Sequence, residues 1–316
     1  MAEENRVTSS TDQFWPGGAR LAVSISMMFE AGGQPISGAT GPLSEPIAEG
    51  YPDLAQNSFY EYGIREGIPR MLNLFDKHDI KVSSFMTGDA VDKHPELANE
   101  IVRRGHEAGG HGQHWANEYL LEPADERASI ASGIRSIERA TGTRPRGFNK
   151  FFMRGSVHTL ELLQELGFSY HIDDLSADEP FIQELPGGPF VTVPYTVHMN
   201  DIGSFDFVGF SPGDYQQQLT DEFEQLYEEG ATQRRMMSIA LHDRISGHAS
   251  RVRVLDRFLT WARGRPHVWW ARRDEIADWV LSTPDTTLRV RRDPAEISGL
   301  PGQSISPLAA TPLEAP

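Results

Sequence analysis

The chain has 316 residues, of which 39% are hydrophobic, and this is enough for one large α/β barrel domain or two ordinary domains. Its formal net charge is −16 at pH 7, which excludes nucleic acid and anionic membrane surfaces as expected partners, because both need a concentrated basic face. It contains no cysteine, so neither a disulfide nor a thiolate metal site can form.

Residues 1–18, MAEENRVTSSTDQFWPGG, are predicted to form an N-terminal extension of the folded domain. They carry acidic residues early and lack the run of about 7 to 15 apolar residues that a signal peptide requires. They also lack the apolar length that anchors a chain in a membrane. We therefore expect a cytoplasmic protein.

The first predicted strand covers residues 20–30, RLAVSISMMFE, an apolar segment bounded by proline and glycine that ends at Glu30. Residues 34–60 are rich in Gly, Pro and Ser and predict a long loop, and loops of this length are usually functional or mobile. A helix follows, in which apolar residues between 64 and 75 recur at helical spacing.

Strands and helices alternate along the rest of the chain. Further strands are predicted at 80–88, 168–174, 190–201, 236–243 and the start of 267–281. Further helices are predicted at 94–105, 124–141, 156–166, 215–226, 254–261 and the end of 267–281. The alternation favours a mainly parallel sheet, and its repetition favours closure into a barrel. We therefore predict a single α/β domain, a (β/α) barrel over residues 19–282, followed by a Pro-rich C-terminal tail over residues 283–316.

Three polar residues lie where predicted strands end. Glu30 and His242 close apolar strands, and His111, in the segment HEAGGHGQHW, follows a Gly109-Gly110 pair that ends a short strand candidate. The carboxyl ends of the strands in a parallel barrel converge on one face, so these side chains are expected to meet. A carboxylate beside two imidazoles suits hydrolysis, because glutamate accepts a proton from water and histidine returns one to a leaving nitrogen.

The order of the segments resembles the polysaccharide deacetylase superfamily and, within it, the branch of the allantoinase-like and cyclic imide hydrolase enzymes. The matching stretches are WPGGARLAVSISMMFEAGG, YEYGIREGIPRML, HPELANEIVRRGHEAGGHGQHW, YHIDDLSADEPF, VPYTVHMND and MMSIALHDRISGHASRVRVLDRFL. They span residues 14–282 and imply a deformed (β/α) barrel of the polysaccharide deacetylase type. The resemblance also implies a homo-oligomer, a tetramer in this branch, with 34–60 and 283–316 as expected contact segments.

The chain departs from the metal-dependent members of this family at two motifs. Their first strand ends in two acids, a general base and then a metal ligand, whereas the matching pair here is Glu30-Ala31. Their second motif has two metal-binding histidines four residues apart, whereas His111 and Trp115 fill those positions here. The allantoinase-like branch, described as working without metal, resembles this chain at both motifs. The resemblance therefore implies a site without a metal cofactor.

Two other interpretations remain open. His114 lies three residues after His111, and residues at this spacing share a helical face, so both could bind zinc together with Glu30. The protein would then be a metal-dependent deacetylase of a sugar or small natural product. The loss of two usual ligands also leaves room for a non-catalytic relative that binds a small molecule.

Metal loss has a consequence for the class of substrate. A bound divalent ion lowers the pKa of its water from 15.7 to about 7, whereas general base catalysis alone contributes about 10²–10⁴-fold. We therefore expect a hydrolase of non-peptide C–N bonds that opens an activated cyclic amide: a ureide, hydantoin or imide. Glu30 would activate water, His242 would protonate the departing nitrogen, and His111 would polarise the carbonyl or hold the water. Asp243 is expected to orient His242 or to cap a turn.

Five further residues are expected to contact a small-molecule substrate. Trp115 is expected to form a pocket wall, and Arg154 looks like the arginine of the family's third motif. Asp173, Asn200 and Asp201 follow strand candidates, where they could bind the N–H and C=O groups of a ring. No catalytic or ligand-binding role is expected for four other histidines. We expect His106 to be satisfied by backbone groups, and three others to lie at the surface: His171, His248 and His267.

Overall fold

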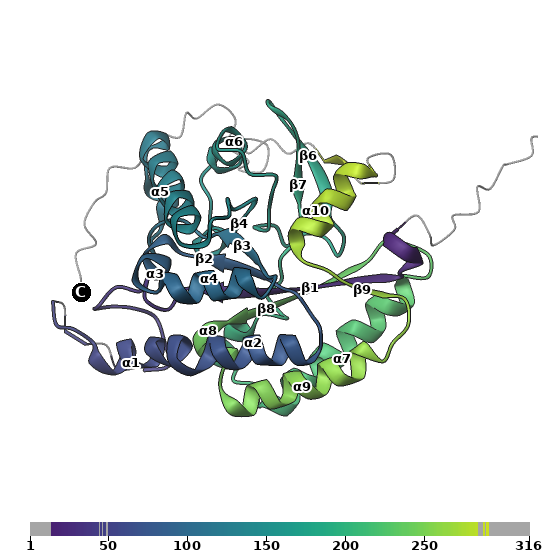
Figure 1. Cartoon of the computed structure of the whole chain (residues 1–316), viewed down its shortest axis with the longest axis horizontal. Coiled ribbons are helices and arrows are strands. Elements are labelled where there is room, and N and C mark those ends of the chain that lie inside the picture. The colour runs from purple at the N-terminus through teal and green to yellow at the C-terminus, as the bar shows by residue number, and fades with distance from the viewer. Residues whose placement is uncertain are drawn as a thin grey trace, which may run out of the picture.

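The strands of the protein form one sheet that wraps into a barrel (Figure 1). The computed structural model describes residues 14–43, 45, 47–48, 50–283, 287 and 289–290. The strands are β1 (Leu21–Phe29), β2 (Ser83–Met86), β3 (Glu107–Gly110), β4 (Gly147–Phe148), β5 (Tyr170–His171), β6 (Phe181–Leu185), β7 (Gly188–Thr192), β8 (Met236–His242), β9 (Val268–Trp270) and β10 (Arg289–Val290). Their order is β10-β6-β7-β5-β4-β3-β2-β1-β8, with β9 beside the start of β1. Paired strands are parallel except β6 and β7.

A backbone bridge closes the barrel between β7 and β8. Asn200, in the segment after β7, forms an isolated parallel bridge with Ala240 of β8. The backbone N–H of Ala240 donates to the carbonyl oxygen of Met199 at 3.2 Å. Because β8 also pairs with β1, the sheet continues around the barrel, and the irregular stretch after β7 makes the barrel a deformed one. The predicted fold class, a single deformed (β/α) barrel, is confirmed.

β1 is the central strand of the barrel. All nine of its residues are buried, and it pairs with β8 along most of its length and with β2 over its last four residues. Burial on both faces explains why its sequence is a near-continuous apolar run rather than an alternating one. Its side chains alternate between a cluster inside the barrel, which includes Ala22 and Met28, and a cluster under the helices, which includes Val23 and Met27.

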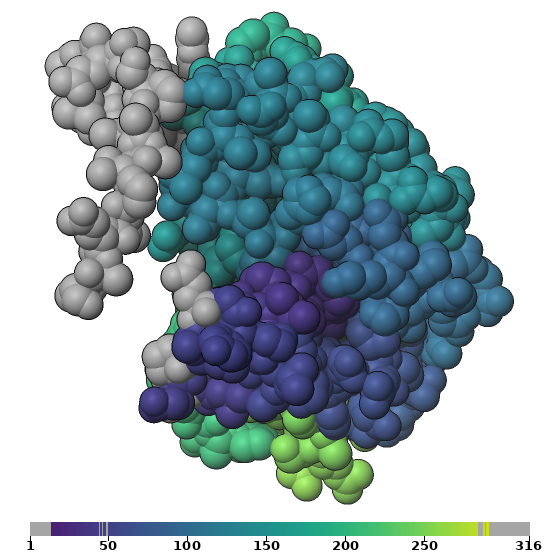
Figure 2. Space-filling view, turned by 90° about the vertical axis from the view of Figure 1, so that its left-hand side faces the viewer, coloured from purple at the N-terminus to yellow at the C-terminus, as the bar shows by residue number. Residues whose placement is uncertain are grey.

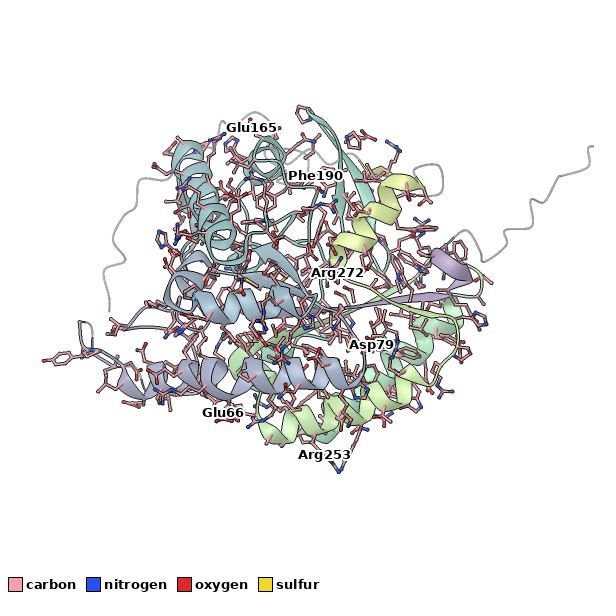
Figure 3. All side chains as sticks on the ribbon, viewed as in Figure 1. Glu66, Asp79, Glu165, Phe190, Arg253 and Arg272 are labelled. Carbon is pink, nitrogen blue, oxygen red and sulfur yellow. The ribbon has the colours of Figure 1, made fainter. Side chains whose placement is uncertain are left out.

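Helices cover the outside of the sheet, and none in the described ranges is long and apolar enough to cross a membrane. They are α1 (Leu54–Tyr62), α2 (Ile68–Lys77), α3 (Gly88–Lys93), α4 (Pro95–Arg103), α5 (Pro123–Thr141), α6 (Thr159–Glu165), α7 (Pro212–Glu229), α8 (Asp243–Ser246), α9 (Ala249–Arg263) and α10 (Arg273–Ser282). α2, α7 and α9 lie along one side of β1 and β8, and α5 and α6 lie across the molecule from them (Figure 1). Side chains fill the space between these layers, while Arg253 on α9 points outward (Figure 3).

The segment after β1 differs from the predicted long loop. α1 begins at Leu54, within the predicted loop 34–60, because the side chain of Asp53 accepts a backbone hydrogen bond from the first turn. α1 continues into α2 through a π-helical segment, η3 (Gly63–Gly67). Pro69 lies in the first turn of α2, directly after this π-helical segment.

The folded domain also extends beyond its predicted limits of 19–282. Trp15, in the predicted extension 1–18, is fully buried, and its indole N–H donates to the carbonyl oxygen of Arg235 at 2.9 Å. β10, which lies within the predicted tail, pairs with β6. Neither strand is predicted from the sequence. The rest of the extension and most of the tail 283–316 lie outside the described residues.

Candidate active site

Polar side chains at the carboxyl ends of three strands point into the mouth of the barrel. Glu30 lies two residues after the inward-facing Met28 of β1, and His242 lies two residues after the inward-facing Ala240 of β8. Because successive side chains alternate across a strand, residues two apart share a face, so both Glu30 and His242 point toward the interior. His111 follows β3 directly. This end of the barrel lies to the left in Figure 1 and faces the viewer in Figure 2.

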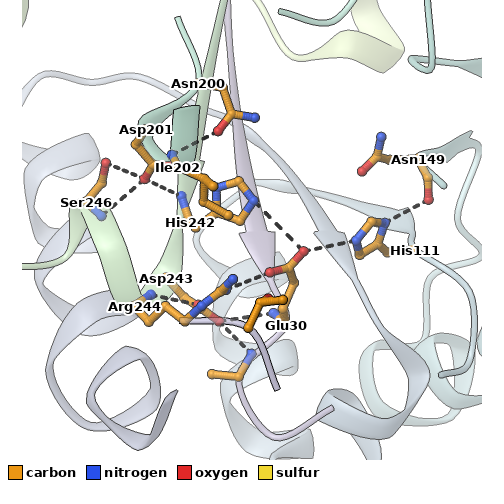
Figure 4. A network of polar contacts seen from close by, with 12 residues as sticks. Glu30, His111, Asn149, Asn200, Asp201, Ile202, His242, Asp243, Arg244 and Ser246 are labelled. Atoms are coloured by element: carbon orange, nitrogen blue, oxygen red, sulfur yellow. Dashed lines mark hydrogen bonds and ion pairs between the residues drawn. The ribbon is translucent and has the colours of Figure 1, made fainter. Parts of the chain in front are cut away.

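Glu30 lies between the two histidines (Figure 4). Its Oε1 atom is 3.1 Å from Nε2 of His111 and 3.9 Å from Nε2 of His242. Its Oε2 atom accepts a hydrogen bond from Nη1 of Arg244 at 2.6 Å. All four side chains belong to residues that are no more than 5% exposed. The three residues predicted to be catalytic therefore share one buried polar cluster, together with an arginine that the sequence analysis does not assign.

Polar contacts at both ring nitrogens hold His111 in a fixed orientation beside Glu30. Nδ1 of His111 lies 2.8 Å from the carbonyl oxygen of Asn149, which only accepts, so Nδ1 carries a hydrogen. The Nε2 atom of the same ring faces Oε1 of Glu30. Burial would raise the pKa of Glu30, but Arg244 and the two histidines hold it well below its usual range. Glu30 is therefore an ionised carboxylate beside the ring of His111.

Asp201 orients His242. Its Oδ1 atom accepts a hydrogen bond from Nδ1 of the ring at 2.6 Å, and its Oδ2 atom accepts one from the backbone N–H at 2.7 Å. Burial would lower the pKa of His242, but Asp201 and Glu30 raise it above its ordinary value. His242 therefore keeps its proton to a higher pH than a free histidine, with Nε2–H directed toward Glu30.

Two acidic residues near the cluster are bound by other groups of the protein. Asp201, expected to contact the substrate, is fully buried, and its oxygens are occupied by His242 and by a serine hydroxyl. Asp243, expected to orient His242 or to cap a turn, does not contact the imidazole in any hydrogen bond of the described chain. Its Oδ2 atom accepts from the backbone N–H groups of Glu30 at 3.0 Å and Ala31 at 2.8 Å. Asp243 therefore fixes the backbone where β1 ends.

Arg244 lies in the short helix α8, directly after β8. The π-helical segment η3 packs closely against this helix, because Gly67 has no Cβ and a Cβ there would overlap an α8 carbonyl oxygen. The guanidinium carbon lies 4.5 Å from the ring centre of Tyr60 and 4.9 Å from that of Trp115, distances typical of cation–π contacts. The one available signal in the sequence is the basic residue two positions after His242 in LHDR.

An aromatic wall stands beside Arg244. Trp115, predicted to be a pocket wall, makes edge contacts with Tyr60 and Phe151, and the ring centres are 5.3 Å apart in both pairs. Tyr60 comes from α1, and Phe151 from the short turn η5 (Phe151–Met153). Aromatic rings from three segments far apart in the sequence therefore pack together beside the polar cluster.

A buried ion pair network anchors the turn that carries Phe151. Nζ of Lys150 lies 2.6 Å from Oε2 of Glu118 and 2.9 Å from Oε1 of Glu126, and the Lys150 side chain is 1% exposed. Glu118 comes from the segment after β3 and Glu126 from α5. The network therefore ties the wall segment after β4 to the segment that carries Trp115.

The remaining predicted substrate contacts divide into two groups. Asp173 lies close to the cluster, because its Oδ1 atom accepts from the side-chain N–H of Asn149 at 2.6 Å, and the carbonyl of Asn149 binds His111. Burial raises the pKa of Asp173 to about 7. Asn200 is half-buried and lies at the bridge to β8. Arg154 is exposed, and its side chain binds no acceptor among the described residues, so it does not join the cluster.

The donors present do not fit the metal site of the metal-dependent family members. The described residues contain no group of three or more histidine, aspartate or glutamate side chains placed to hold a metal ion. His114, the third ligand of the alternative zinc site, is exposed and pairs with Asp89 at 2.9 Å rather than with His111 or Glu30. The negative charge of Glu30 is balanced by the guanidinium of Arg244.

The other histidines lie outside this cluster. His106 is buried, and burial lowers its pKa to about 4. Its Nδ1 atom accepts a backbone hydrogen bond at 3.1 Å, as predicted, but its Nε2 atom has no hydrogen-bond partner among the described residues. The prediction that His171 lies at the surface is wrong, because this residue is buried and bonded to a threonine hydroxyl. His248 is half-buried in a ring stack, and His267 is exposed.

Comparisons with known proteins agree with this architecture. The polysaccharide deacetylase family model matches residues 57–171. A probable polysaccharide deacetylase from Pseudomonas aeruginosa PAO1 is 33% identical, with a TM-score of 0.80 over 85% of this chain and 94% of that chain. The peptidoglycan deacetylase of Helicobacter pylori is 25% identical over 284 residues, which cover 79% of this chain and 94% of that protein.

The chain therefore belongs to the polysaccharide deacetylase family, a family of hydrolases that act on carbon–nitrogen bonds. Within that family it is similar to Puue allantoinase, with 33% identity and a TM-score of 0.81 over 86% of this chain and 93% of that chain. The family and its allantoinase-like branch, to which Glu30 and Trp115 point in the sequence, are confirmed at this level.

Proposed function

We propose that the protein hydrolyses a small cyclic amide, namely a ureide, hydantoin or imide, without a bound metal ion. The observation that carries the proposal is the buried cluster at the barrel mouth, where Glu30 Oε1 lies 3.1 Å from His111 and 3.9 Å from His242. The similarity to a protein named allantoinase adds support.

The donor set favours an activated substrate. Ala31 and Trp115 occupy two positions at which the metal-dependent members carry ligands, so the carbonyl must be polarised by protein donors alone. Without a metal-activated water, general base catalysis contributes about 10²–10⁴-fold, which is little for an unstrained N-acetyl group. A cyclic imide or ureide has a more electrophilic carbonyl and a better leaving nitrogen. It therefore needs less assistance from the site.

Each residue of the cluster has a role in this reaction. Glu30 accepts a proton from the attacking water, for which its ionised state is suited. His242, held in one tautomer by Asp201, donates a proton to the departing nitrogen. His111 polarises the substrate carbonyl or holds the water in place.

The surroundings of the cluster suit a flat ring. Trp115 offers an aromatic face on which a planar ureide can stack. Asp173 and Asn200 lie after strands that end at the same barrel mouth, where they can bind N–H and C=O groups of the ring.

A metal-dependent deacetylase remains the second candidate, supported by the name of the Helicobacter pylori relative. A panel of allantoin, hydantoin, succinimide and N-acetylated sugars separates the two functions. We expect turnover of at least one cyclic compound and none of the sugars. Turnover of the sugars alone rejects the proposed substrate class, and binding without any turnover favours a non-catalytic relative.

A further inference from the structure

The guanidinium of Arg244 has hydrogen-bonding capacity that the protein leaves unused. Its Nη1 atom donates to Glu30 at 2.6 Å and lies 3.4 Å from Oδ1 of Asp243. Within the described part of the chain, its Nε and Nη2 atoms have no acceptor. Neither is among the fully buried atoms that lack a partner, so each keeps a small accessible surface. A residue that is 2% exposed therefore presents two free donors and a positive charge beside the reacting cluster.

We propose that Arg244 is a catalytic residue whose free N–H groups bind the carbonyl oxygen of the substrate and the oxyanion that develops on it. The guanidinium thus supplies the positive charge that a metal ion supplies in the metal-dependent relatives. The inference rests on the proposed function, since it concerns the same site. It extends that function by naming the group that stabilises the transition state.

The position of the guanidinium is fixed before the substrate binds. The faces of Tyr60 and Trp115 confine it on two sides, and Glu30 and Asp243 hold one of its edges. Donors that are oriented in advance, in a site with little water, stabilise a developing oxyanion without the cost of rearrangement. The planar fork of arginine also leaves two adjacent N–H groups free while a third is engaged, which a lysine ammonium cannot match in geometry.

The reaction balances with these groups. The water oxygen bonds to the carbonyl carbon while one water proton passes to Glu30, and the π pair of the carbonyl moves onto the oxygen held by Arg244. The carbonyl then re-forms and the carbon–nitrogen bond breaks, as His242 gives its proton to the nitrogen. Glu30 returns the water proton to His242 across the 3.9 Å between them, which leaves an opened ring with a new carboxyl group.

Sharing Arg244 between Glu30 and the substrate also couples the two. While the guanidinium serves Glu30 alone, it keeps this carboxylate a weak base. As negative charge builds on the substrate oxygen, the guanidinium interacts more strongly with that oxygen and stabilises the Glu30 carboxylate less. Glu30 therefore becomes a stronger base as the water attacks.

Substitution of Arg244 tests the proposal on the cyclic amide that the wild-type protein opens. In Arg244→Ala we expect kcat to fall by about 10²–10³-fold, the effect of removing one oxyanion donor, with a small change in KM. Guanidinium chloride, at concentrations far below those that unfold proteins, should restore part of the rate. The acid limb of kcat/KM should move to higher pH, because Glu30 loses the charge that lowers its pKa. Arg244→Lys should retain more activity than the alanine variant.

A matched control is Arg265→Ala, which removes an exposed arginine stacked on Trp261 at 4.5 Å. It should keep wild-type activity and show no response to guanidinium. A folded Arg244→Ala protein that loses activity without rescue and without a moved acid limb would assign Arg244 a structural role and overturn the proposal. If the alanine variant unfolds in a thermal melt, Arg244→Lys decides the matter, since wild-type kcat in that variant also overturns it.

Binding of hydantoate, the ring-opened carboxylate of hydantoin, separates this proposal from the proposed function. Its carboxylate resembles the oxyanion, and we expect calorimetry to show about tenfold or weaker binding in Arg244→Ala. If turnover is unaffected in Arg244→Ala, the role of Arg244 is rejected but the proposed function is not. No turnover of cyclic amides with Arg244-dependent hydantoate binding rejects the proposed function alone. No turnover together with Arg244-independent binding rejects both.

Discussion

Asp201 binds His242 at two points, through the ring Nδ1 atom at 2.6 Å and through the backbone N–H at 2.7 Å. The ring contact fixes the tautomer, and the backbone contact fixes the end of β8. Nε2 is then the ring nitrogen that faces Glu30. A fully buried acid therefore prepares the imidazole to donate a proton at one defined atom.

Asp201→Asn should reduce catalysis without removing the fold. The amide keeps the shape of the carboxylate, but it removes the charge that favours the imidazolium and can present an N–H to Nδ1. We expect kcat to fall by about 10²–10⁴-fold, as is typical when an acid/base group loses its orientation. Steady-state kinetics measures the effect, and Asp221→Asn, an exposed acid on α7, serves as the control. A loss equal to that of the control would remove Asp201 from the catalytic group.

The pH dependence of activity should carry the signature of His242. Burial lowers its pKa, but Asp201 and Glu30 raise it above the ordinary value, so the imidazolium persists above about pH 6.5. The alkaline limb of kcat/KM should therefore lie above the range of a free histidine. In Asp201→Asn this limb should move to lower pH, and a limb that stays in place would argue against His242 as the acid.

Glu107, at the amino end of β3, should make the fold less stable as the pH rises through neutral. Burial, and the neighbouring Asp274, raise the pKa of Glu107 above its ordinary value, while Ser83 and Tyr170 donate hydrogen bonds to it. A carboxyl whose pKa is raised by folding stabilises the native state below its unfolded pKa, and this contribution is lost as the pH rises through its folded pKa. Thermal melts between the unfolded and the folded pKa of Glu107 should show a smaller decrease of Tm in Glu107→Gln than in the wild-type protein. An equal decrease in both proteins would contradict the assignment.

Lys150→Met should destabilise the aromatic wall. The substitution leaves Glu118 and Glu126 buried without their shared cation, and the loss of one partner from a buried ion pair costs about 3–5 kcal/mol. Urea denaturation measures the free energy of unfolding. Lys81→Met, which removes a half-buried lysine paired with the exposed Asp76, is the control and should change stability by less than about 1 kcal/mol. Equal losses of unfolding free energy in the two variants would show that the Lys150 network stabilises the fold no more than the Lys81–Asp76 pair does.

The sequence predicts the barrel and the three central residues because both depend on strand periodicity. Glu30 and His242 end apolar strands, and the alternation of side chains along a strand decides which face they occupy. The parallel arrangement then brings their strand ends together. Local patterns of this kind are visible without any knowledge of the packing.

The roles of Asp201 and Arg244 are not predictable in this way. Asp201 follows the irregular segment after β7, so its approach to His242 depends on how that segment closes the barrel. Arg244 reaches Glu30 because α8 turns back over the end of β1, and the absence of a Cβ at Gly67 allows this packing. Arg154 is a different case: a motif match predicts that it contacts the substrate, and in the structure its side chain is exposed and makes no hydrogen bond to the cluster.

Ring opening by metal-depleted protein tests most directly whether Glu30 and the two histidines act without a metal ion. The protein is treated with chelator until elemental analysis finds less than about a tenth of a divalent ion per chain, and its rate is compared with that of Glu30→Gln. We predict full activity in the depleted wild-type protein and a loss of about 10²-fold or more in the variant. Activity that disappears on depletion and returns with zinc, or that survives in Glu30→Gln, would contradict this assignment of the site.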